Sequence, residues 1–208
     1  MPQSKANRYC FRIGVTGHRR LNDPAAVEAL VKRAIEAEAG KLFPAKLRKK
    51  IEDGRQAGTA PLSFCVVSPL AEGADRVVAR AVLESLDACL DAVIPLALED
   101  YLEDFATEES RKDFAELLSR CGEPVFLRTR LIRDERVDAG GRAELRRDAY
   151  AQAGRYVVDH CDVLIAVWDG QPSGGHGGTA EIVEYAQKQN RPVLRVWGDS
   201  FEALNRIA

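Results

Sequence analysis

The chain has 208 residues, 46% of them hydrophobic, which is enough apolar material for one α/β domain with a sizeable core. The formal net charge of −2 gives no electrostatic basis for binding nucleic acid, and no apolar run approaches the roughly 20 residues that span a membrane. Because the first residues also lack the apolar core of a signal peptide, we expect a cytoplasmic protein with a disordered tail over residues 1–10 and a single domain over 11–208.

Six apolar segments alternate with amphipathic ones, in the pattern of strands that are each followed by a helix. Strands are predicted at residues 11–16, 62–67, 91–96, 124–127, 163–168 and 192–197. A first helix is expected to begin at Asn22 or Asp23, with Pro24 in its first turn, because these residue types favour helix starts. Further helices are predicted at residues 76–86, 107–119, 142–160 and 179–187. The polar and basic residues 43–59 form either a helical extension or an inserted loop.

This alternation predicts a three-layer, Rossmann-like, doubly wound α/β fold, in which a mainly parallel sheet of about six strands carries helices on both faces. Ligands bind such sheets outside the carboxyl ends of the strands. The glycine-rich loop before residue 179 is the strongest candidate there, because glycine lets backbone approach a ligand and a helix N-terminus directs N–H groups at an anion. Its predicted ligand contacts are Gly174, Gly175, His176, Gly177, Gly178 and Thr179. A flexible surface loop is the alternative interpretation.

Other loops at this edge add candidates with hydroxyl, guanidinium, imidazole or carboxylate groups. After the first two strands they are Thr16, Gly17, His18, Arg19, Ser68, Gly73 and Asp75. The guanidinium of Arg19 is suited to phosphate, whereas the histidines either contact the ligand or hydrogen-bond a neighbouring loop. Asp169 would accept ribose hydroxyls or cap its own turn. Tyr101 would stack on a base, beside an acidic loop over residues 99–104.

The segment between residues 128 and 155 holds eight arginines, which we expect mainly on a solvated face. Within it, Gly154 is placed at helical spacing so that its helix can approach a neighbour closely. Apolar residues of the last two long helices would leave surface that one sheet face does not cover, which favours a homodimer or larger assembly. These residues are Val157, Val158, Ile182 and Val183.

The cysteines are odd in number and scattered, at positions 10, 65, 89, 121 and 161. No Cys-x-x-Cys pair occurs, and several lie in or beside the predicted strands. Reduced structural thiols are therefore expected. Since no group of His, Asp, Glu or Cys has the sequence spacing of metal ligands, we expect no metal site and no cofactor.

Three motifs, in this order along the chain, resemble the SLOG superfamily, the Rossmann-like group that includes the DprA/Smf proteins and the LOG nucleotide hydrolases. The first is Ile-Gly-Val-Thr-Gly-His-Arg at residues 13–19. The second, Ser-Pro-Leu-Ala-Glu-Gly-Ala-Asp at 68–75, resembles the Ser-Gly-Leu-Ala-x-Gly-x-Asp turn of the DprA branch, with Pro69 replacing a glycine. The third, Gly-Gly-His-Gly-Gly-Thr-Ala-Glu at 174–181, resembles the Pro-Gly-Gly-x-Gly-Thr-x-x-Glu signature of the LOG branch, with one extra glycine and no preceding proline.

The resemblance implies a site for a nucleotide or a nucleotide derivative. In LOG hydrolases the glutamate of the motif helps to cleave an N-glycosidic bond, and Glu181 matches it by position. Those enzymes also carry an Arg-Lys pair on the preceding helix, which residues 150–156 lack; Arg146 and Arg147 lie one or two turns earlier. We therefore favour a sensor of a nucleotide-derived signal that controls a fused or associated effector.

Two alternatives remain open at this stage. One is an N-glycoside hydrolase or nucleoside deoxyribosyltransferase that acts on nucleoside monophosphates, with Glu181 as the catalytic carboxylate. The other is an oligomeric scaffold whose pocket is vestigial.

Overall fold

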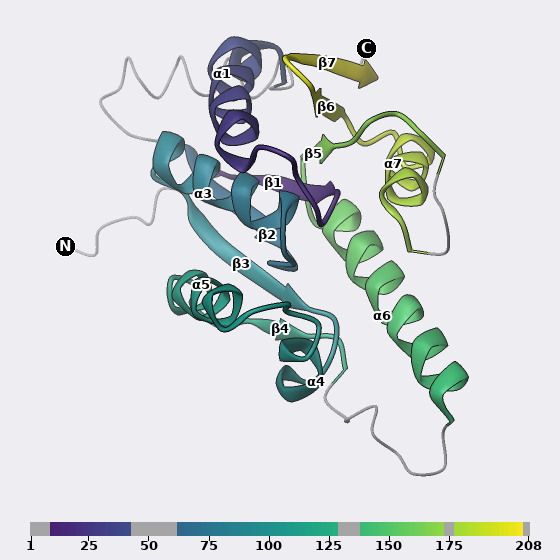
Figure 1. Ribbon diagram of the computed structural model, residues 1–208. Helices are drawn as coiled ribbons and strands as arrows, with labels where there is room; N and C mark the ends of the chain where they lie inside the picture. Colours follow the sequence, from purple (N-terminus) through teal and green to yellow (C-terminus); the bar gives the residue numbers. More distant parts are fainter. Residues whose placement is uncertain (1–8, 43–61, 129–137, 173–176, 206–208) are drawn as a thin grey trace, which may run out of the picture.

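Apolar runs of the chain build a central sheet of seven strands. They are β1 (Tyr9–Gly17), β2 (Leu62–Ser68), β3 (Cys89–Ile94), β4 (Val125–Phe126), β5 (Val163–Val167), β6 (Val193–Trp197) and β7 (Ser200–Asn205). The structure is a computed structural model that describes residues 9–42, 62–128, 138–172 and 177–205 (Figure 1). The strand order is β4-β3-β2-β1-β5-β6-β7; the first six strands along the chain are parallel, and β7 pairs antiparallel with β6. The direction of winding reverses between β1 and β5, so the topological switch point lies at their carboxyl ends.

Helices cover both faces of the sheet (Figure 1). They are α1 (Pro24–Leu42), α3 (Ala74–Leu86), α4 (Leu98–Leu102), α5 (Glu108–Ser119), α6 (Ala139–Asp159) and α7 (Thr179–Lys188). Side-chain caps start three of them. Asp23 Oδ1 accepts from the Ala26 N–H at 2.9 Å, Thr107 Oγ1 from the Ser110 N–H at 3.1 Å, and Asp138 Oδ1 from the Gly141 N–H at 2.8 Å. Of the helices in the described ranges, none has the combined length and apolar character that crossing a bilayer requires.

Two apolar clusters hold the layers together. One joins β1 residues such as Phe11 and Val15 to α1, α3 and α5 on one face of the sheet. The other joins β5 to α6 and α7 on the opposite face. Gly154 permits this second packing, since a Cβ at that position would lie 2.5 Å from Ile182 Cδ1. The close helix approach predicted for Gly154 is therefore confirmed.

The apolar surface that was expected to drive self-association is not exposed, so this reason for predicting an assembly is wrong. All four apolar residues on which it rested lie in the second cluster and are at most 2% exposed. They are Val157, Val158, Ile182 and Val183. The facing strands and the partner helix cover them, so these side chains leave no free apolar surface on α6 or α7.

The alternation of strands and helices is confirmed, with three local differences. The acidic run 99–104 is not a loop, because its first part forms α4 with Glu99 and Asp100 in the opening turn. A seventh strand follows β6 through a turn at Gly198, whose φ is +62°. β4 is only two residues long. The segment 43–59 lies outside the described residues.

Candidate functional site

The turn that follows β1 is fitted between the start of α3 and the end of β5. Gly17 has no room for a side chain, because a Cβ there would lie 2.5 Å from Ala74 Cβ and 2.7 Å from Val167 O. The His18 N–H donates to Val167 O at 3.1 Å, and the His18 carbonyl accepts from the Ala74 N–H at 3.0 Å. These contacts fix the backbone of residues 17–19 at the switch point of the sheet.

The turn that follows β2 uses its polar side chains internally. Ser68 is fully buried, and its Oγ accepts from the Leu70 N–H at 3.0 Å. The Asp75 carboxyl group accepts from the Ala71 N–H at 3.1 Å. The Ser68 hydroxyl, predicted as a ligand contact, is thus a structural group of the turn.

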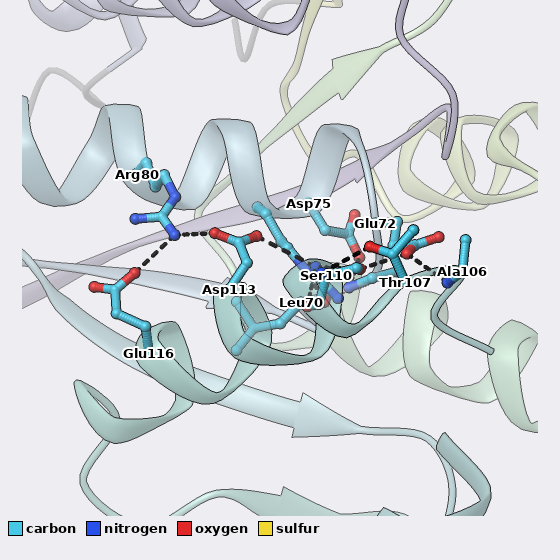
Figure 2. Close-up of polar contacts among 11 residues, drawn as sticks. Leu70, Glu72, Asp75, Arg80, Ala106, Thr107, Ser110, Asp113 and Glu116 are labelled. Atoms are coloured by element: carbon cyan, nitrogen blue, oxygen red, sulfur yellow. Dashed lines mark hydrogen bonds and ion pairs between the residues drawn. The ribbon is translucent and has the colours of Figure 1, made fainter. Parts of the chain in front are cut away.

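Gly73 and Arg76 connect this turn to its neighbours. Gly73 has a φ of +80°, and a Cβ there would lie 2.3 Å from Arg19 O, so only glycine fits. Arg76 is 5% exposed; its Nε donates to Leu70 O at 3.0 Å and its Nη1 to Ser110 O at 2.8 Å. Figure 2 shows how this network continues between α3 and the acidic residues of α5. The turn is therefore fixed to α5 as well as to β1.

A cavity of about 440 Å³ opens where the two turns meet α6 and α7. Its volume falls within the range of small-molecule sites. The residues predicted as ligand contacts that line it are Thr16, Gly17, Arg19, Asp75, Gly177, Gly178 and Thr179. The structure thus gathers residues from three separate motifs around one space.

A second cavity of about 340 Å³ lies beside the first. The two share Gly17, Arg19 and the α7 start at residues 177–179 as lining. The second cavity adds His18 and Asp169 from the other side of the switch point. Residues 177–179 at the α7 start and Arg19 therefore border both spaces. A helix N-terminus beside a guanidinium group suits an anion.

α6 contributes a polar wall to the larger cavity. The Arg19 guanidinium lies over the Tyr150 ring, 4.4 Å from its centroid. The Tyr150 hydroxyl donates to the Asp104 carboxylate, which also pairs with Arg146 at 2.7 Å. Burial raises the pKa of Tyr150, so its hydroxyl remains a donor at neutral pH. Arg147 lines the same cavity, and its side chain makes no hydrogen bond or ion pair with the rest of the described chain.

The prediction that the arginines of this segment mainly form a solvated face missed these residues. Arg146 keeps 23% of its side chain exposed and binds Asp104, and both Arg146 and Arg147 line the cavity. The available signal was the spacing of residues 146, 150 and 154, which places them on one helix face. Gly154 lies on the face that meets Ile182 of α7, so this face points toward the site.

Asp75 is the buried carboxyl group of the larger cavity, with 7% of its surface exposed. Burial raises its pKa to about 7, against the opposing effects of the Ala71 N–H and of Arg19 and Arg76. A carboxyl group with this pKa gains and loses its proton near neutral pH. Such groups occur at functional sites more often than elsewhere.

His18 and Asp169 form a pair at the second cavity, and both side chains are 32% exposed. His18 Nε2 lies 3.3 Å from Asp169 Oδ1 and accepts from the Asp169 N–H at 3.3 Å. The Gln171 N–H donates to Asp169 Oδ1 at 2.9 Å and is the main cause of the lowered pKa of Asp169. The sequence left two interpretations open for each residue. In the structure His18 contacts the neighbouring loop, and Asp169 caps its own turn.

Glu181 lies in the first turn of α7, where its carboxylate is engaged on both sides. Oε2 accepts from the Gly177 N–H at 2.8 Å, and Oε1 pairs with Arg155 Nη2 at 2.9 Å. Among the described lining of the two cavities, Glu181 does not occur. This arrangement matches a carboxylate that stabilises a helix start.

Tyr101 does not face either cavity. It is completely buried, its hydroxyl donates to Pro69 O at 3.0 Å, and its ring packs edge-on against Phe105 with centroids 5.0 Å apart. A ring in this position cannot stack on a base, so that prediction is wrong.

Three of the predicted contacts, Gly174, Gly175 and His176, lie outside the described residues. Comparison of the chain with protein-family models gives no match, and comparison with curated proteins gives none either.

Proposed function

We propose that this chain binds a nucleotide or nucleotide-derived signal at the carboxyl edge of its sheet and acts as a sensor. The observation that carries the proposal is the pair of adjoining cavities, about 440 Å³ and 340 Å³, at the topological switch point. A phosphate would lie at their common boundary, against the α7 N-terminus and Arg19. The ribose and base would extend into the spaces on either side.

The charges around the larger cavity favour an anionic ligand with a defined orientation. Arg147 offers a cation with no partner in the described part of the chain, whereas Arg146 is already paired with Asp104. Asp75 can remain protonated near neutral pH and then donates a hydrogen bond instead of repelling a phosphate.

Binding is favoured over bond cleavage because the carboxylate that the resemblance singles out is occupied. Glu181 already holds the Gly177 N–H and Arg155. Cleavage of an N-glycosidic bond needs a carboxylate near the ribose and a group that activates water or the leaving base. A carboxylate that holds a helix start in place instead shapes the binding loop.

The test is a thermal-shift screen against nucleoside mono-, di- and triphosphates, cyclic nucleotides, NAD and ADP-ribose. A ligand at 100 times its dissociation constant adds about 2.7 kcal/mol of stability, which raises the Tm of a chain of this size by roughly 5–10 °C. Arg19→Ala should weaken the ligand found in this way about 10-fold or more, because it removes a charged contact. Arg20→Ala changes an exposed neighbour that lines neither cavity and should leave affinity unchanged. A panel without a stabilising member, or equal losses in both variants, would contradict the proposal.

One observation supports N-glycoside hydrolysis as the second candidate function. Asp75 lines the larger cavity and has a pKa near 7, the property of a general acid or base. Free base would then be released from nucleoside monophosphates or deoxynucleosides, and Asp75→Asn would suppress the release more strongly than Glu181→Gln. A sensor releases no base in this assay.

A further inference from the structure

Three cysteines that are far apart in the sequence meet at the amino ends of the central strands, opposite the cavities. Cys65 of β2 and Cys89 of β3 are direct partners in the parallel ladder. Cys65 also pairs with Arg12 of β1, and Cys10 lies two residues before Arg12, on the same face of the sheet. The Sγ atoms of the three cysteines all lie within 4.8 Å of one another. Sequence spacing gave no hint of this group because each thiol comes from a different strand.

We propose that Cys10, Cys65 and Cys89 together bind a thiophilic metal ion of the zinc class. Zinc binds cysteine sulfur at about 2.3 Å in tetrahedral geometry, which places two bound sulfurs roughly 3.8 Å apart. The observed separations approach this value, so small side-chain rotations suffice to close the site. Sulfur donors select zinc over magnesium or calcium, which prefer oxygen ligands.

The surroundings suit a coordinated ion. Cys65 is buried and fixed in the sheet, whereas Cys89 is exposed and leaves a path by which an ion can enter. Asp91 lies on the same strand face as Cys89, and its carboxylate pairs with Arg12 at 2.7 Å. The Arg12 guanidinium beside it offsets part of the negative charge that three thiolates bring.

The metal-free thiols hold their protons. Burial, followed by the neighbouring Cys89 and Asp91, raises the pKa of Cys65, and burial also raises that of Cys10. A bound divalent ion displaces these protons and keeps the sulfurs as thiolates. Without an ion, the competing state is a disulfide between the ladder partners Cys65 and Cys89, which leaves Cys10 unused. The convergence of three thiols instead of two favours the metal.

The experiment measures metal binding by the full chain, reduced and stripped of metal with a chelator. Titration with Co²⁺ should produce a thiolate-to-cobalt charge-transfer band and intense visible d–d bands, and Zn²⁺ should abolish both. Elemental analysis after Zn²⁺ loading and desalting should find one zinc per chain.

Two accessible variants test the ligands without disturbing the core. Cys89→Ser and Cys10→Ser should each weaken Zn²⁺ binding more than about 100-fold, beyond the loss seen when a residue that only supports a ligand is changed. Cys161→Ala removes a buried thiol that lies outside the group and should leave binding intact. Circular dichroism of each variant shows that the fold is kept.

Three results would overturn the proposal. They are reduced wild-type protein that takes up neither Co²⁺ nor Zn²⁺, zinc retained by the Cys10→Ser/Cys89→Ser double variant, and a Cys65–Cys89 disulfide that persists under conditions that reduce the other thiols. None of these measurements involves a nucleotide, so their outcome is independent of the function proposed for the cavities.

Discussion

At the scale of single residues, Asp75 and Gly73 hold the turn after β2 in a conformation that costs folding free energy. Burial raises the pKa of the Asp75 carboxyl group to about 7, so this group keeps its proton at lower pH. Gly73 occupies a backbone conformation with φ +80°, pressed against the carbonyl of Arg19. Each feature brings the turn against β1, and each has a measurable energetic signature.

The pKa of Asp75 predicts how stability depends on pH. Its value rises from 3.8 to about 7 on folding, so between these values the folded state binds the proton and the unfolded state does not. Stability is therefore highest below about pH 4 for this group and is lost as the pH rises toward 7, by at most about 1.4 kcal/mol per pH unit.

Urea unfolding of wild type and Asp75→Asn across this range measures the effect. The wild type should lose free energy of unfolding with rising pH relative to the variant, in which the contribution is absent. Parallel pH profiles of the two proteins would show that Asp75 titrates normally.

Gly73→Ala should destabilise the protein by about 2–4 kcal/mol. A Cβ at this position would lie 2.3 Å from Arg19 O, and the backbone conformation is one that L-residues rarely adopt. Gly122→Ala is the matched control, because nothing lies within 4 Å of a Cβ there, and it should change stability by less than about 0.5 kcal/mol. Similar chemical-denaturation midpoints for the two variants would argue against a fixed turn.

At the scale of elements, the N-terminus of α7 forms part of the lining of both cavities in the candidate site. Gly177 has a φ of +79°, and a Cβ there would lie 3.0 Å from Arg147 O. The α7 N-terminus and the cavity-facing side of α6 are therefore in direct contact through this glycine.

Gly177→Val should abolish nucleotide binding while the protein stays folded. The added side chain would move the α7 start away from α6 and fill the boundary shared by the two cavities. Gly198→Val carries the same kind of backbone strain, with φ +62°, but has open space around it and lies in the β6–β7 turn. This control should bind the ligand as the wild type does. Calorimetric titration compares the two, and wild-type affinity in Gly177→Val would exclude the loop as a phosphate site.

Sequence periodicity predicted the strands and helices well where apolar runs were long. β5 at Val163–Val167 follows from consecutive apolar residues, and β1 at Tyr9–Gly17 from the mainly apolar run predicted at 11–16. The helix predicted at 107–119 is α5, which begins after the Thr107 cap. The seventh strand was missed because Ser200–Asn205 mixes polar and apolar residues and forms only by pairing with β6. α4 was missed because a five-residue acidic segment has no measurable period.

For the candidate site, the sequence could predict the backbone turns that border the cavities but not the side chains that complete their walls. Gly17, Gly73 and Gly177 carry local conformational signals that a sequence shows directly. The positions of Arg147 and Tyr150 in the cavity wall depend on how α6 crosses the carboxyl edge, which is a tertiary property. The same reason explains Tyr101, whose burial depends on packing by α4 and α5.

At the scale of the whole molecule, stability should fall from the centre of the sheet to its edges. β1 lies between β2 and β5, and its apolar residues join the larger core. β4 has two exposed residues, Val125 and Phe126, and β7 closes the other edge. Among the large apolar side chains that are exposed in the described ranges, these two are adjacent in the sequence. Self-association of the chain stays a prediction.

Native-state hydrogen exchange should reveal this gradient. Amides of β1 and β5 should exchange only through global unfolding, whereas those of β4 and β7 should exchange through local opening that costs much less free energy. Mass spectrometry of peptides from each strand measures the difference. Equal protection of β7 and β1 would contradict a fall in stability from the centre of the sheet to its edges.

The central position of β1 also has a consequence for synthesis on the ribosome. Arg12 N–H donates to Asp162 Oδ2 at 2.8 Å across 150 residues of chain, and β1 and β5 pair along the same stretch. Translation at about 5–20 residues per second leaves roughly 8–30 seconds during which β1 has emerged but β5 does not yet exist. During that interval one edge of the central strand can pair with wrong partners. Early β1–β2 pairing covers only the opposite edge of β1. The edge that later pairs with β5 therefore depends on other protection, such as a chaperone, until the last third of the sequence arrives.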